Sequence, residues 1–168
     1  MVEMAVESIR VSLINQQRLV VLREEGGPRY LPIWIGAFEA EAISMGLQEV
    51  EVTRPMTHDL IHGIIEQLGA TVTSICVSDL QDDTFFAQIN LDRKGKSLEI
   101  DCRPSDAIAL AVRAGVPIYV SDDVMERAGQ LPAEEYEERA TTRRGRDDDK
   151  LDVFREFIEG LDMDDLET

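Results

Sequence analysis

The sequence predicts an α+β fold, in which a mixed, mainly antiparallel sheet packs against helices. Three patterns support this prediction. Residues 71–102 contain three consecutive alternating segments joined by short polar turns, which is typical of an antiparallel meander. Residues 37–50 and 58–68 carry apolar side chains at helical spacing. Residues 100–120 have the pattern of a strand, a short helix and a second strand.

The N-terminal part begins with three expected strands. Residues 3–14 alternate weakly between apolar and polar side chains, and residues 19–22 form the return strand after a polar turn. The residues Gly26-Gly27-Pro28 give a strong turn signal before the third strand, residues 29–35. Because Pro32 has no N–H to donate, we expect this strand at an edge of the sheet or in an irregular position.

Two helices are expected after these strands. Gly36 ends the third strand, and the helix of residues 37–50 sets apolar side chains against acidic ones. In the second helix, residues 58–68, the apolar side chains follow the 3.6-residue period. Thr57 has the side chain of a good N-cap for this helix, and Gly69 ends it.

The meander is expected to place its strands at residues 71–80, 84–92 and 96–102, with polar turns between them. Alternation along the middle strand predicts that one of its faces is apolar and packs on the core. The side chains of that face are Phe85, Ala87, Ile89 and Leu91.

The unit at residues 100–120 is the centre of the predicted fold. Arg103-Pro104 is expected to end its first strand, which leaves Ser105 in the position of an N-cap. The helix that follows is apolar on every side, so we expect it to be buried all round. Gly115 supplies a left-handed ending, and residues 118–120 form the second strand.

The composition changes near residue 130, which we take as the end of a domain at residues 1–130. Before it, Ser121 is expected to cap a short helix, residues 122–128. Residues 131–149 carry dense charge of both signs and few apolar side chains, which predicts a flexible linker. Residues 150–168 regain a helical apolar stripe before an acidic end, and we expect them to dock on the domain or to bind a protein partner.

The chain has 168 residues, of which 43% are hydrophobic and 30% charged, and this is ordinary for a soluble globular protein. No run approaches the roughly 18 apolar residues of a membrane span. The N-terminus lacks the basic and apolar regions of a signal peptide. We therefore expect a cytoplasmic protein without membrane contact, and we expect Cys76 and Cys102 to be buried, reduced thiols.

The chain is strongly acidic. It contains 17 basic and 34 acidic side chains, which gives a formal net charge of −17. The acidity is spread along the sequence, since residues 1–129 hold 20 acidic and 11 basic side chains and residues 130–168 hold 14 and 6. Proteins that grip nucleic acid by neutralising phosphates are normally basic, at least locally. Any contact with nucleic acid must therefore be small, metal-assisted or assembled across subunits.

Three ionisable groups, Asp101, Arg103 and Asp106, come together at the turn before the central helix. A helix N-terminus beside a guanidinium and a carboxylate can bind an anion or a metal-bridged phosphate. The alternative is structural: Asp106 helps to cap the helix, and Arg103 pairs with a neighbouring carboxylate.

Three motifs in order give the chain a resemblance to a known family. They are YLPIWIG with Glu39-Ala40 at residues 30–40, RP with THDL at residues 54–60, and DCRPSDA at residues 101–107, which leads to PIYV at residues 117–120. Over residues 5–130 the sequence resembles the bifunctional nuclease domain family, whose members are assigned DNase and RNase activity. The resemblance implies a compact α+β domain that self-associates, and a nuclease with little sequence preference.

Phosphodiester hydrolysis needs an activated water and neutralisation of charge at the phosphate, and a divalent metal held by carboxylates supplies both. Candidate ligands for Mg²⁺ or Mn²⁺ are the carboxylates that stand at motif positions, with neighbours brought in by folding. Arg103 is a candidate for stabilising the transition state, and His58 for acid–base catalysis. The candidate metal ligands are Asp101, Asp106, Asp59 and Glu39.

The catalytic candidates are therefore Asp101, Arg103, Asp106 and His58. The candidates for substrate binding are Arg54, Ser105 and Trp34, with DNA or RNA as substrate. Trp34 can stack on a base, or it can pack under a helix or in a subunit interface. A second function stays open, because the net charge of −17 disfavours nucleic acid: a non-enzymatic regulatory protein that binds a small anion or a protein partner.

Overall fold

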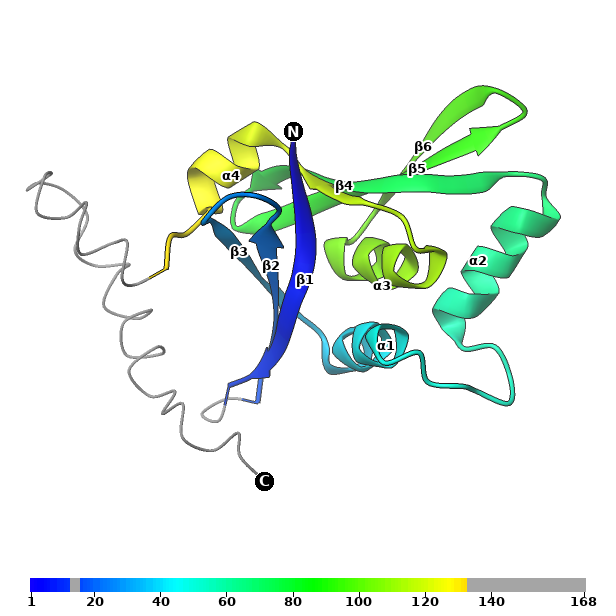
Figure 1. Cartoon of the computed structure of the whole chain (residues 1–168), viewed down its shortest axis with the longest axis horizontal. Coiled ribbons are helices and arrows are strands. Elements are labelled where there is room, and N and C mark those ends of the chain that lie inside the picture. Colours follow the sequence, from blue (N-terminus) through cyan, green and yellow to red (C-terminus); the bar gives the residue numbers. More distant parts are fainter. Residues whose placement is uncertain (13–15, 133–168) are drawn as a thin grey trace, which may run out of the picture. The chain divides into compact units, whose positions relative to one another are not determined.

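The computed structural model describes residues 1–12 and 16–132 (Figure 1). This part is an α+β domain with a mostly antiparallel seven-stranded sheet and four helices, so the predicted fold class is confirmed. The predicted linker beyond residue 132 and the C-terminal segment 150–168 lie outside the described residues. The elements in chain order are β1 (Val2–Val11), β2 (Arg18–Glu24), β3 (Tyr30–Ile35), α1 (Ala37–Leu47), α2 (Thr57–Gln67), β4 (Thr71–Gln81), β5 (Thr84–Arg93), β6 (Lys96–Cys102), α3 (Pro104–Ala114), β7 (Ile118–Val120) and α4 (Asp122–Ala128).

The sheet joins two groups of strands that are each continuous in sequence. Its order is β3-β2-β1-β7-β4-β5-β6, so β7 lies between the N-terminal strands and the meander. Residues 118–120 pair antiparallel with residues 2–4 of β1 and parallel with residues 75–77 of β4. The strand β3 with Pro32 lies at one edge of the sheet, as the proline predicted.

Helix α3 connects β6 to β7 and crosses the meander. Because β6 and β4 run in the same direction, and β4 is parallel to β7, the chain needs a crossover between β6 and β7, and a helix supplies it. The helix packs on β4 and β5, and all of residues 107–111 are at most 1% exposed. The apolar pattern of this helix thus predicted its burial correctly.

Helices α1 and α2 pack against α3 rather than directly against most of the sheet (Figure 1). Helix α4 lies against β4 and β3. The core contains the expected face of the middle meander strand, since Ala87 is fully buried and Ile89 and Leu91 are each 7% exposed. Phe85 packs partly buried against this core.

The structure corrects two predicted helix caps. Helix α3 has Arg103 as its N-cap and Pro104 as its first residue, so Ser105 lies inside the helix. Proline is favoured at this first position because its φ is already helical and its missing N–H has no helical partner. Helix α2 likewise begins one residue earlier than expected, with Met56 as N-cap in place of Thr57.

The predicted ends at Gly115 and Ser121 are confirmed, whereas the predicted end of the first helix is wrong. Gly115 has a left-handed φ of 65° at the end of α3. The Ser121 hydroxyl accepts a hydrogen bond from the Val124 N–H at 3.2 Å, which caps α4. The helix predicted at residues 37–50 is shorter, because α1 ends at Leu47.

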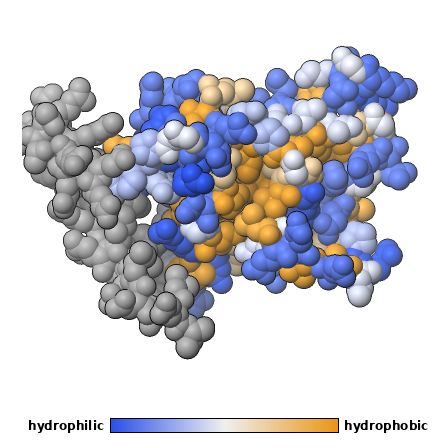
Figure 2. All heavy atoms as spheres, in the orientation of Figure 1, coloured by the Kyte–Doolittle hydropathy of each residue, from blue (hydrophilic) through white to orange (hydrophobic). Residues whose placement is uncertain are grey.

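Both cysteines are free thiols; Cys76 is buried and Cys102 is partly buried. In residues 1–12 and 16–132, no helix is long and apolar enough to span a membrane. Figure 2 shows a continuous apolar area in the middle of the viewed face, surrounded by hydrophilic side chains. Helix α2 also presents Leu60, Ile64 and Leu68 to the surface, with 55%, 48% and 64% exposure.

Candidate functional site

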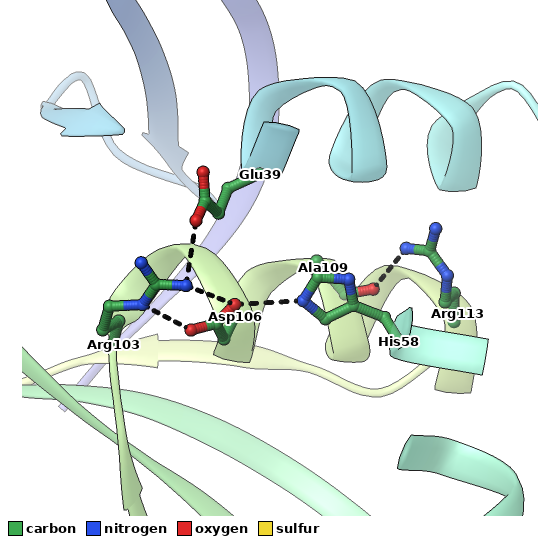
Figure 3. A network of polar contacts seen from close by, with 6 residues as sticks. All are labelled: Glu39, His58, Arg103, Asp106, Ala109 and Arg113. Atoms are coloured by element: carbon green, nitrogen blue, oxygen red, sulfur yellow. Dashed lines mark hydrogen bonds and ion pairs between the residues drawn. The ribbon is translucent and has the colours of Figure 1, made fainter. Parts of the chain in front are cut away.

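Arg103 is the centre of a polar network between the helices (Figure 3). Its Nε donates to Asp106 Oδ2 at 2.7 Å, and its Nη2 donates to Asp106 Oδ1 at 3.2 Å. The same Nη2 lies 2.9 Å from Glu39 Oε1. The Arg103 side chain is 66% exposed, whereas those of Glu39 and Asp106 are 18% and 28% exposed. One accessible cation therefore joins two half-buried carboxylates.

His58 supports Asp106 from the protein interior. Its Nε2 lies 3.1 Å from Asp106 Oδ1, and its side chain is 8% exposed. Because an ionised carboxylate can only accept, the proton of this hydrogen bond belongs to Nε2. Burial raises the pKa of Asp106, but hydrogen bonds from Arg103 and His58 outweigh burial and hold this pKa below its ordinary value of 3.8. Asp106 is therefore a carboxylate at neutral pH.

The first turns of three helices supply these side chains. Glu39 lies in the first turn of α1, His58 in that of α2, and Asp106 in that of α3. A negative charge is favourable in a first turn, where backbone N–H groups lack helical partners. Glu39 folds back over Gly36, the N-cap of α1, and its carboxylate occupies the space that a β-carbon at residue 36 would need. Gly36 thus leaves room for the carboxylate that contacts Arg103.

Asp59 does not join this network. Its Oδ1 accepts from Arg113 Nε at 2.7 Å, and its Oδ2 accepts from the Met56 N–H at 2.8 Å. Burial raises the pKa of Asp59, but these bonds outweigh burial and lower it. Arg113 also donates to the Ala109 carbonyl at 2.9 Å. Asp59 therefore caps α2 and ties it to α3.

Asp101 is an exposed residue of β6, where it pairs with Gln88 of β5. Within residues 1–12 and 16–132, no hydrogen bond or ion pair joins Asp101 to the Arg103 network. Its negative charge nevertheless reaches Cys102, where it contributes to a raised thiol pKa. The structure thus brings together Glu39, His58, Arg103 and Asp106, and it leaves Asp101 and Asp59 outside.

Of the four carboxylates predicted as metal ligands, only Glu39 and Asp106 come together, on either side of Arg103. In the part of the chain that the structure describes, no group of three or more His, Cys, Asp or Glu side chains is placed to hold a metal ion. The space between Glu39 and Asp106 is bridged by the Arg103 guanidinium, which forms ion pairs with both carboxylates. This arrangement does not fit a Mg²⁺ or Mn²⁺ site, and we derive no chemical step from one.

The three residues predicted to bind substrate occupy different environments. Arg54 is exposed in the connection between α1 and α2. Ser105 is 6% exposed, whereas Trp34 is 56% exposed on the edge strand β3. Of the three alternatives for Trp34, packing under a helix does not occur within the described chain, and stacking on a base or packing in a subunit interface stay predictions.

A cavity of about 390 Å³ lies next to the network. Arg103 and Ser105 line it from the start of α3, and Trp34 lines it from β3. The other wall comes from the start of β5, with Thr84 and Phe85. Nothing in the sequence connects Thr84 and Phe85 with a site, because alternation predicts Phe85 in the core and only folding brings the start of β5 to the same cavity as Trp34.

Arg113 was also missed, although a signal was present. It follows Asp106 by seven residues and therefore lies on the same face of α3. Arg113 can therefore pair with a carboxylate on a helix that packs against this face of α3, as Asp59 of α2 does.

Comparison with known proteins identifies a family and several relatives. The model of the bifunctional nuclease domain family matches residues 20–132. An uncharacterized protein of Mycobacterium tuberculosis is 43% identical over 166 residues, which are 99% of this chain and 98% of the relative.

Two plant relatives carry functional names. The protein named Bifunctional nuclease 1 of Arabidopsis thaliana is 29% identical over 61% of this chain. The protein named Bifunctional nuclease 2 of Oryza sativa subsp. japonica is 31% identical over 62% of this chain. The matched segment spans 33% of each plant protein. The family match covers most of the described domain, and the chain belongs to the bifunctional nuclease domain family.

Proposed function

We propose that the chain hydrolyses phosphodiester bonds in DNA and RNA with little sequence preference, at the network of Glu39, His58, Arg103 and Asp106. The observation that carries this proposal is one accessible guanidinium beside a carboxylate that a buried histidine supports. Family membership and the names of the plant relatives support the same reaction class.

Arg103 can bind the phosphate without leaving its carboxylates. Its Nε and Nη2 contact Asp106 and Glu39, and within residues 1–12 and 16–132 no acceptor contacts Nη1. An arginine carries two N–H bonds on Nη1, so this nitrogen can donate to a phosphate oxygen. A single charged contact to the backbone reads no base, which accounts for little sequence preference.

In this proposal, Asp106 takes a proton from the attacking water. As water attacks phosphorus, a new P–O bond forms and the bond to the leaving sugar oxygen breaks. The water proton passes to Asp106, and the leaving oxygen takes a proton from solvent. Sharing Arg103 with the phosphate weakens its bonds to Asp106, which makes the carboxylate a stronger base than in the free protein. His58 is too buried to reach a polymer, and it acts by holding Asp106 in position.

The test is a cleavage assay on single-stranded DNA and RNA with the full-length chain. We expect Asp106→Asn to lower kcat by about 10²–10⁴-fold, the usual contribution of a proton-transferring group. Arg103→Lys should raise KM, because an ammonium cannot hold Asp106, Glu39 and a phosphate in one plane. Glu99→Gln is the matched control, since it removes an exposed charge from β6 and should leave both constants unchanged.

Two further arms complete this assay. Asp101→Asn shows whether the exposed carboxylate on β6 also takes part, and parallel reactions with Mg²⁺, Mn²⁺ or EDTA test the predicted metal requirement. Unchanged cleavage by folded Asp106→Asn protein would rule out this active site.

The net charge of −17 favours a second function. So acidic a chain repels a polymer of phosphates along its whole length, whereas a small anion carries few charges and is repelled less. The alternative is therefore a regulatory protein that binds a small anion at Arg103. Absence of cleavage by pure wild-type protein under every metal condition would favour this alternative.

The proposal includes self-association through α2. Leu60, Ile64 and Leu68 follow one another at four-residue spacing and form an apolar stripe on the helix surface. An apolar stripe without charge can pair with its own copy across a two-fold axis. The protein partner expected for segment 150–168 lies outside the described residues and stays a prediction.

A further inference from the structure

We infer that the cavity beside Arg103 holds the base and sugar of one unpaired nucleotide, with the base stacked on Trp34. This inference rests on the proposed function and names its substrate as single-stranded nucleic acid. Arg103 belongs to both the polar network and the cavity wall, so a phosphate bound there has its own nucleoside at the cavity mouth.

The cavity wall has the chemistry of a nucleoside site. Trp34 and Phe85 are aromatic and lie on different strands, β3 and β5, that both line the cavity. Aromatic faces stack on any base, which agrees with low sequence preference. Thr84 and Ser105 add hydroxyl groups that can hydrogen-bond to a sugar or to a base edge.

The backbone of Trp34 has a fixed position in the sheet. In β3 the side chains of Leu31 and Ile33 enter the core with 0% and 3% exposure, and Trp34 lies on the opposite face with 56% exposure. Its backbone pairs with Leu19 of β2, so the indole stands on a rigid strand rather than on a loop. Stacking on a side chain whose backbone is paired in the sheet needs little ordering of the backbone.

The volume of the cavity suits one nucleoside better than a base pair. Its volume of about 390 Å³ is near the small end of ligand pockets, which run from about 300 to 1,000 Å³. One nucleoside fills such a space, and a duplex would have to unpair and turn a base outward, which costs free energy. We therefore expect single strands and unpaired ends to be cleaved faster than duplex.

Trp34 is the only tryptophan of the chain, so its fluorescence reports directly on the cavity. The experiment titrates the full-length protein with adenosine 5′-monophosphate, with adenosine and with inorganic phosphate. We expect saturable quenching by the nucleotide, weaker quenching by adenosine, and competition without quenching by phosphate. Arg103→Gln should weaken nucleotide binding at least tenfold and leave adenosine binding unchanged.

Cleavage kinetics supply the second readout. Trp34→Ala should raise KM for a single strand by about tenfold, in the range of base stacking, and Trp34→Phe should restore most of the loss. Phe38→Ala is the matched control, because Phe38 is an aromatic residue of α1 that is 85% exposed and does not line the cavity.

The outcomes separate the two proposals. Cleavage without quenching, or equal KM for Trp34→Ala and wild type, overturns the nucleoside cavity and leaves the proposed function standing. Quenching that depends on Arg103 without cleavage supports the cavity and overturns the proposed hydrolysis. Equal quenching of wild type and Arg103→Gln by the nucleotide overturns the link between the cavity and Arg103.

Discussion

Cys102 lies next to Arg103 in sequence, yet its environment disfavours the reactive thiolate. Burial, together with the carboxylates of Asp106 and Asp101, raises its pKa from 9.0 to about 11. Burial also raises the pKa of Cys76. Since the thiolate is the reactive form, both thiols are poor nucleophiles in the folded protein. Neither cysteine is therefore placed for covalent catalysis.

This pKa predicts the rate of thiol modification. In a Cys76→Ala protein at pH 8, Cys102 should react with a disulfide reagent about a hundredfold more slowly than a thiol of the ordinary pKa of 9.0, because the thiolate fraction falls tenfold for each unit. Asp106→Asn should speed the reaction, since it removes one of the negative charges. The rate in urea serves as reference, and equal rates in native and unfolded protein would contradict the prediction.

The contact between Arg103 and Asp106 could be predicted from the sequence. Arg103 and Asp106 are three residues apart at the start of one helix, so their contact follows from helical spacing alone. The partners Glu39 and His58 come from α1 and α2, and their distances to α3 depend on how the helices pack. The same packing makes Asp59 an ion-pair partner of Arg113 rather than a metal ligand. The spacing of residues within α2 could not reveal this pairing.

At the scale of the element, the stability of α3 depends on the glycine at its C-terminal end. Gly115 has a φ of 65°, and a side chain there has open space but an unfavourable backbone. Gly63 lies inside α2, where an added β-carbon also meets no atom within 4 Å. These two glycines separate the effect of backbone conformation from that of packing.

We expect Gly115→Ala to lower the free energy of unfolding by about 1 kcal/mol, the cost of a left-handed alanine. Gly63→Ala should raise this free energy by about 0.5–1 kcal/mol, since alanine loses less entropy in a helix. Urea unfolding of both variants measures the two changes. A loss of stability in both variants would mean that packing, rather than backbone conformation, determines the effect of an added methyl group.

Most element types and boundaries could be predicted, because they depend on neighbouring residues. Glycines mark the ends of α2 and α3, and the two meander turns place Asp82, Asp83 and Lys94 at positive φ, as tight hairpins require. The wrong N-caps at Thr57 and Ser105 have one cause: side-chain preference was given more weight than backbone geometry. Pro104 could have corrected the second, since proline favours the first helical position.

At the scale of the molecule, the surface of α2 bears on assembly. Three leucine and isoleucine side chains exposed by about half on one helix represent apolar area that a second copy would remove from water. Sequence periodicity predicted an apolar face for this helix. It could not show that α3 covers only part of that face.

We expect Ile64→Glu to reduce the molar mass measured by light scattering to that of one chain. The control is Ile100→Glu on β6, which adds the same charge at a residue of 47% exposure against 48% for Ile64. A glutamate in an apolar contact loses its hydration without a partner, so association should fall by more than tenfold. A wild-type monomer, or equal loss of association in both variants, would contradict the role of α2.

The strand order was the part of the fold that sequence could not supply. Residues 118–120 form the shortest strand of the sheet, and they pair with the first strand on one side and with β4 on the other. Each of the two flanking strand groups can form from segments that are neighbours in sequence. Joining the groups requires residue 2 of β1 to pair with residue 120 of β7. Contacts so distant along a chain form slowly. Until β7 arrives, the unpaired edges of β1 and β4 can recruit strands from other molecules. The rate at which β7 pairs with β1 and β4 therefore governs how much of the protein aggregates during refolding at high concentration.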